Sequence, residues 1–177
     1  MKKMITSSVF TLSILILSST NIFAQLSPSV TAEYTVQQID EMYQKHKMFK
    51  PQDTYPSQEL QKKQLKDFPG SREIEWEKSD ILYEVEFEIG RFPSRDYKAY
   101  YDMADKLIMY SEEISTKDVP AIVKNGALAK YPNFRIEDAE KIVKGKDTFY
   151  KLELEKGDYE VKLALDFNGT ILKEGIE

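Results

Sequence analysis

The chain has 177 residues, no cysteine, 41% hydrophobic residues and a net charge of −5 at pH 7. Without cysteine the protein has no disulfides, thiolate metal sites, thiol nucleophiles or lipidated cysteine, so its stability depends on a hydrophobic core, which a chain of this size can bury. The acidic balance disfavours nucleic acid and anionic membrane surfaces as partners, because phosphate recognition needs a basic patch.

Residues 1–24 have the three-part layout of a secretory signal peptide. Lys2 and Lys3 supply the positive charge, residues 9–17 are the apolar stretch, and Ala24 is the small residue before a cleavage site. The apolar stretch is too short for a membrane span, which needs about 20 apolar residues. We therefore expect an exported protein, in the periplasm or secreted, with no membrane insertion and, lacking cysteine, no lipoprotein anchor.

The segment 25–56 is the least patterned part of the mature chain. Aromatic, apolar and histidine side chains recur in it at helical spacing, which predicts a short amphipathic helix over 36–48: Val36, Ile39, Tyr43 and His46. Pro51 and Pro56 then indicate a linker.

The remainder of the chain divides into two similar units, 57–114 and 115–177. Phe68-Pro69 in the first unit matches Tyr131-Pro132 in the second, and each motif ends a predicted helix, because the residue before proline avoids the helical conformation. Similarity at a nearly constant spacing indicates one supersecondary unit used twice.

Strands follow each predicted helix. Apolar residues alternate with glutamates over 83–89 and with polar residues over 159–167, as in half-buried strands. Asn168-Gly169 is a strong hairpin signal, because both residues accept positive φ. We therefore predict an α+β fold: a tandem repeat of one helix plus about four antiparallel strands, with the helices packed on one face of the sheet and water on the other.

Five motifs together resemble the PepSY-like family that has the β-lactamase-inhibitory-protein-like fold. They are Phe68-Pro69, 83–87, Tyr131-Pro132, 150–154 and 166–169, and the similarity covers about residues 57–175. The resemblance implies a tandem α-β repeat, export, and a binding or inhibitory role without a set of catalytic residues.

Few residues are suited to catalysis. His46 is the only histidine, so a Ser-His-Asp triad or a histidine metal site would have to use it, and simple packing or exposure on a short helix is the alternative interpretation. No phosphate-binding loop is present. A pair of carboxylates could hydrolyse glycosides, but such pairs arise by chance in a chain with 30 acidic residues. We expect no enzyme, cofactor or metal site.

The first unit offers a candidate contact surface. If the residues that alternate with 83, 85 and 87 face solvent, six side chains form a partner-binding face: Glu84, Glu86, Glu88, Lys98, Tyr100 and Asp102. Its acidic excess would suit a basic partner, with Tyr100 as an anchor. The alternatives are a solvated face that prevents aggregation, or contact through the 89–96 loop.

These observations predict a non-catalytic exported binding module that recognises a protein or peptide. Two alternatives are an inhibitor of a periplasmic or secreted hydrolase, such as a peptidase or β-lactamase, and an envelope-assembly or structural factor.

Overall fold

The computed structural model describes residues 28–176, so the predicted signal peptide lies outside the described residues. The elements in chain order are α1 (Val36–Met48), β1 (Gln52–Asp53), α2 (Gln58–Asp67), β2 (Arg72–Lys78), β3 (Leu82–Ile89), β4 (Arg95–Asp102), β5 (Leu107–Glu113), α3 (Ala121–Lys130), β6 (Arg135–Lys144), β7 (Asp147–Lys156), β8 (Tyr159–Asp166) and β9 (Ile171–Ile176). α1 covers the segment where the sequence predicts a helix.

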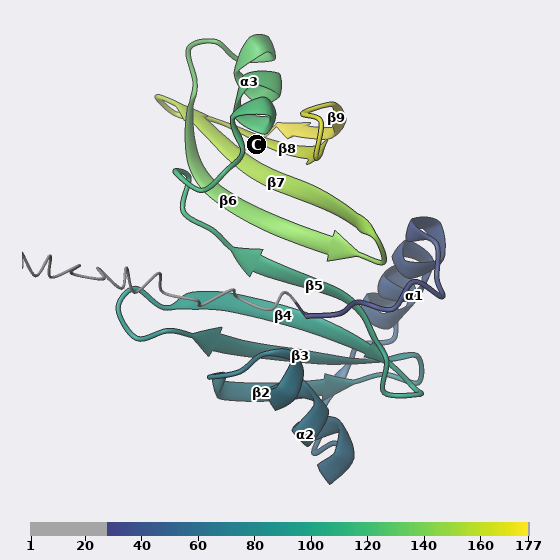
Figure 1. Cartoon of the computed structure of the whole chain (residues 1–177). Coiled ribbons are helices and arrows are strands. Elements are labelled where there is room, and N and C mark those ends of the chain that lie inside the picture. The colour runs from purple at the N-terminus through teal and green to yellow at the C-terminus, as the bar shows by residue number, and fades with distance from the viewer. Residues whose placement is uncertain (1–27, 177) are drawn as a thin grey trace, which may run out of the picture.

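The strands form one nine-stranded antiparallel sheet in which spatial order follows chain order (Figure 1). The predicted tandem repeat of helix plus about four strands is therefore wrong. β5 pairs with β6 from Met109↔Lys144 to Glu113↔Glu140, so the sheet continues through the expected boundary at residue 114. Two separate units would each expose the edge of a strand there, and pairing satisfies both edges.

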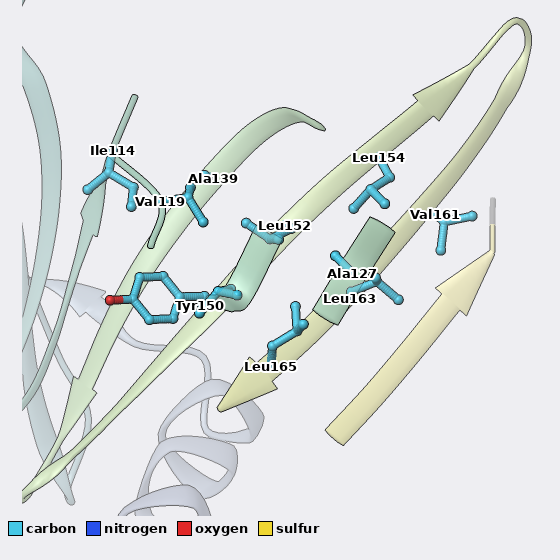
Figure 2. Close-up of a cluster of buried hydrophobic side chains, with 11 residues drawn as sticks. Ile114, Val119, Ala127, Ala139, Tyr150, Leu152, Leu154, Val161, Leu163 and Leu165 are labelled. Atoms are coloured by element: carbon cyan, nitrogen blue, oxygen red, sulfur yellow. The ribbon is translucent and has the colours of Figure 1, made fainter. Parts of the chain in front are cut away.

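One face of this sheet is covered by α2 and α3. Leu60 of α2 and Phe68 pack on the strand residues Val85, Phe87 and Tyr97. On the second half of the same face, α3 supplies Val123 and Ala127 to a cluster that includes Leu152, Leu154, Leu163 and Leu165 of β7 and β8 (Figure 2). These apolar clusters supply most of the hydrophobic stabilisation of the fold.

The helix α1 packs on the opposite face, over one end of the central strands β3 to β6 (Figure 1). Its Ile39 is fully buried with Leu82, Tyr100 and Ile108, whereas Tyr101, the neighbour of Tyr100 in β4, packs under α2. The prediction that helices occupy one face and water the other is therefore wrong. Adjacent strand residues point to opposite faces, so the apolar residues at this end of both faces need helical cover.

The position of α1 is set by contacts at both of its ends. Thr35 begins the helix with a capping box that includes Gln38. Asp40 pairs with Lys144 at the end of β6, whereas His46, near the other end of α1, bonds to Glu84 of β3. The helix therefore spans the junction between β5 and β6.

The helix α3 sits directly on the turn between β8 and β9. Gly169 in this turn has a φ of +81°, as the Asn168-Gly169 signal predicts. A Cβ atom on Gly126 of α3 would lie only 2.0 Å from the carbonyl oxygen of Gly169. Glycine at position 126 is therefore required by the close approach of helix and turn.

Candidate binding surface

The part of the sheet that α1 leaves uncovered forms a concave, acidic groove. Strands β2 to β7 contribute to it, and its volume is about 650 Å³. Two lysines, Lys98 and Lys151, line the groove. Nine acidic residues also line it: Glu73, Glu75, Glu86, Glu88, Asp96, Glu113, Asp138, Glu140 and Glu153. We call this surface the acidic groove.

Within the acidic groove, four carboxylates form a row across four adjacent strands. Glu88 of β3 is the direct partner of Asp96 of β4, and Glu113 of β5 is the direct partner of Glu140 of β6. Tyr97 of β4 pairs with Glu112 of β5. The next positions along the two antiparallel strands are Asp96 and Glu113, which therefore lie side by side. Neighbouring strands are about 4.8 Å apart. Like charges at this spacing destabilise a sheet.

Basic side chains neutralise only the ends of this row. Arg72 contacts Glu88 at 2.5 Å, and Lys151 lies 3.9 Å from Glu140. Within residues 28–176, neither Asp96 nor Glu113 forms an ion pair, and both are exposed. The centre of the row therefore carries uncompensated negative charge.

The structure divides the six residues that the sequence predicts as a contact face. Glu86, Glu88 and Lys98 line the acidic groove, and Lys98 pairs with Glu86 at 2.5 Å.

The other three are buried: Glu84 and Tyr100 lie under α1, and Asp102 accepts a hydrogen bond from Tyr34. They are therefore inaccessible to a partner in this conformation.

Sequence reasoning missed the contribution of the second half of the sheet. Asp138 and Glu140 on β6, and Glu153 on β7, share the acidic groove with residues of β3. These acidic residues alternate with apolar residues in their own strands, and that pattern indicates a solvent-facing position. The missing information was that β5 pairs with β6, because the two halves were interpreted as separate units.

A buried polar network lies beneath α1, next to the acidic groove. The Nδ1 and Nε2 atoms of His46 lie 2.8 Å from Ser79 Oγ and 2.9 Å from Glu84 Oε2. Lys47 and the hydroxyl of Tyr100 also donate to Glu84. The network thereby satisfies polar groups that would be costly to bury alone.

This network holds Glu84 in its ionised form. Burial by itself would raise the pKa of Glu84, but the hydrogen bonds from His46, Lys47 and Tyr100 outweigh that effect and lower the pKa to about 2. Burial, together with the negative charge of Glu84, raises the pKa of Tyr100 well above its ordinary value. The carboxylate is therefore an acceptor that fastens α1 to the sheet.

Ser79, His46 and Glu84 are connected like a nucleophile, base and orienting acid. The arrangement differs from a working triad, because Ser79 Oγ already accepts hydrogen bonds from the backbone of Ile81 and Leu82, and His46 is fully buried. A substrate has no access to the serine in this conformation. The geometry instead suits attachment of a helix.

Within residues 28–176, no group of three or more histidine, aspartate or glutamate side chains is arranged to hold a metal ion. None of the helices in this part of the chain is long and apolar enough to cross a membrane.

Comparisons with known proteins identify the fold. No protein-family model and no curated protein matches the sequence. Among solved structures, a BLIP-like protein from Bacteroides fragilis is similar, with 21% identity and a TM-score of 0.57 over 70% of this chain and 87% of that one. A DUF2874 family protein from Bacteroides uniformis has 16% identity and a TM-score of 0.58 over 69% of this chain and 90% of its own.

A protein from Bacteroides eggerthii, provisionally named periplasmic, has 15% identity and a TM-score of 0.59 over 70% and 90% of the two chains. At these identities the comparisons establish fold alone. The fold of this chain is BLIP-like, in agreement with that part of the predicted resemblance.

Proposed function

We propose that the protein is an exported, non-catalytic binding module whose acidic groove receives a basic segment of a protein or peptide partner. The observation that carries this proposal is the row Glu88, Asp96, Glu113 and Glu140, whose centre is unpaired at the floor of a concave surface. Lysine and arginine side chains of a partner would relieve the repulsion within this row.

The electrostatics of the groove favour such a partner in two ways. A concave surface lined by one sign of charge concentrates its field and accelerates the approach of an oppositely charged molecule. Direct pairing with Asp96 and Glu113 then adds charge-assisted hydrogen bonds. Of the predicted contact residues, Glu86, Glu88 and Lys98 are accessible for this role.

The fold comparisons support the proposal at a coarser level. One similar protein is named BLIP-like and another is provisionally named periplasmic, which fits an exported binding module. We place this protein in the periplasm, without a lipid anchor, on the basis of the signal-like residues 1–24 and the absence of cysteine.

The test is capture of the partner from an envelope extract on immobilised protein, with elution in increasing salt. Glu113→Lys should strongly reduce capture, whereas Asp158→Lys, an equal charge reversal in the exposed turn after β7, should not. Captured protein should elute as salt screens the groove. Equal capture by wild type and Glu113→Lys would refute the groove as the binding site.

A second candidate function is inhibition of a hydrolase, which the BLIP-like fold favours. The mature protein should then slow at least one peptidase or β-lactamase at micromolar concentration or below, and Glu113→Lys should relieve the inhibition. Recovery of a stable membrane complex in the capture experiment would instead favour an envelope-assembly role.

A further inference from the structure

The outer edge of β2 is only partly covered. The two-residue strand β1 pairs with Glu77 and Lys78, and the backbone N–H of Thr54 donates to the carbonyl of Trp76. The chain then turns away towards α2, and among the described residues no strand pairs with the outer edge of β2 before Trp76. An open edge of this kind can accept an extended segment of another chain.

A cavity of about 620 Å³ lies beside this open edge. Its apolar wall comes from three elements: Leu65 of α2, Ile74 and Trp76 of β2, and Tyr55 of the connection. Tyr55 is 99% exposed and Leu65 is 47% exposed. Exposed aromatic and aliphatic side chains around a concavity form the kind of pocket that receives an anchoring side chain. We call it the edge pocket.

The polar residues that line the edge pocket define the charge of its occupant. Five acidic residues line it, Asp53, Glu75, Glu77, Glu84 and Glu86, and no lysine or arginine lines the pocket. Glu75 and Glu86 also line the acidic groove, so the two surfaces are continuous around β2. A single extended segment can therefore contact both.

We infer that the edge pocket takes an aromatic or large aliphatic side chain from an extended partner segment that carries lysine or arginine next to it. This inference rests on the proposed function, because the segment belongs to the same basic partner. The occupant lies alongside β2 and continues the line of β1. A register shift between Arg72 and Glu75, with Glu73 at a φ of +53°, limits the length of the open edge. Backbone pairing is therefore short, and the pocket supplies the specificity.

Trp76 provides a direct probe, because it is the only tryptophan in the chain and it lines the edge pocket. A phage-displayed library of random heptapeptides is selected against the folded wild-type protein, and the selected peptides are then titrated while Trp76 emission is recorded. We expect selected sequences with one aromatic or large aliphatic residue beside lysine or arginine. Their binding should shift the emission of Trp76 to shorter wavelength.

Leu65→Asp places a charge at the mouth of the pocket and should weaken these peptides at least tenfold. Met103→Asp is the matched control, because Met103 has the same 47% exposure in the turn after β4, and it should leave binding unchanged. Thermal unfolding of both variants verifies that they fold. Selected peptides that lack the motif, that bind Leu65→Asp as tightly as wild type, or that leave Trp76 emission unchanged would overturn the inference.

Capture of the envelope partner by the two variants tests this inference separately from the proposed function. Loss of the partner in both Glu113→Lys and Leu65→Asp would support the edge pocket. Loss in Glu113→Lys alone would overturn the edge pocket and leave the acidic groove as the binding site. Self-association of the protein that Leu65→Asp abolishes would also overturn it, because the occupant would then be a second copy of this chain.

Discussion

The Nε2 atom of His46 lies 2.9 Å from Oε2 of Glu84, although the two residues are 38 positions apart and neither is exposed. The imidazole and the carboxylate satisfy each other in a site that water does not reach. This contact holds α1 on the face of the sheet that the sequence predicts to be open to solvent. The helix in turn covers the part of this face that lies outside the acidic groove.

The stability of the protein should depend on pH through Glu84. Its folded-state pKa is lowered from 4.5 to about 2, so the ionised form stabilises the fold above pH 4.5, and this contribution is lost as the pH falls through about 2. The free-energy difference between wild type and Glu84→Gln should be constant above about pH 5 and should shrink by about 3 kcal/mol in strong acid. Urea unfolding at several pH values measures it. A difference independent of pH would contradict the lowered pKa.

Replacing His46 should lower the free energy of unfolding. His46→Ala removes a fully buried ring and one of the donors to Glu84, and should destabilise the protein by about 3 kcal/mol. Lys47→Ala is the comparison: Lys47 bonds to the same carboxylate, but its side chain is 42% exposed and its removal leaves no cavity, so the loss should be smaller, about 1–2 kcal/mol. Chemical denaturation of the two variants gives the comparison, and equal losses would show that burial of His46 is unimportant.

The contact between α3 and the turn after β8 should tolerate no side chain at residue 126. Alanine is normally favoured over glycine within a helix by about 1 kcal/mol. Gly126→Ala should nevertheless destabilise the fold by about 1–3 kcal/mol, because its Cβ would meet the carbonyl of Gly169 at 2.0 Å. Gly175→Ala has open space around the added carbon and should change the melting temperature little. A stabilised Gly126→Ala would contradict this packing.

The acidic groove should show a trade-off between stability and binding. Glu113→Lys replaces a like-charge contact with Glu140 by an attractive one, so the free protein should become more stable by about 0.5 kcal/mol. The same variant should bind the envelope partner more weakly and with a smaller dependence on salt. Melting temperature and binding titrations measure the two effects. A destabilised variant would show that the carboxylate row is not strained.

The sequence predicted local features well because they depend on neighbouring residues. The alternation over 83–89 correctly placed Val85 and Phe87 in the core, and Asn168-Gly169 correctly marked the turn between the paired strands β8 and β9. What failed were inferences about long-range packing. Nothing near Tyr100 indicates that a helix more than 50 positions earlier covers it, so an inward residue was assigned to solvent.

The site was predicted only in part for the same reason. Glu86 and Glu88 were identified from the pattern of their own strand, and both line the acidic groove. Glu113 and Asp138 were not identified, because their relation to Glu88 depends on the pairing of β5 with β6. The PepSY relationship, the signal peptide and the unit boundaries stay predictions.

Because the nine strands follow one another in chain order, each strand can find its partner as soon as the next segment is available. Such local pairing keeps the entropy cost of closing loops small and favours rapid folding. The contact between Asp40 and Lys144 is different, because it joins residues 104 positions apart. A chain that emerges amino-terminus first would therefore build β2 to β5 while α1 still lacks its distant partner. Docking of α1 at both ends would be possible only after β6 has emerged.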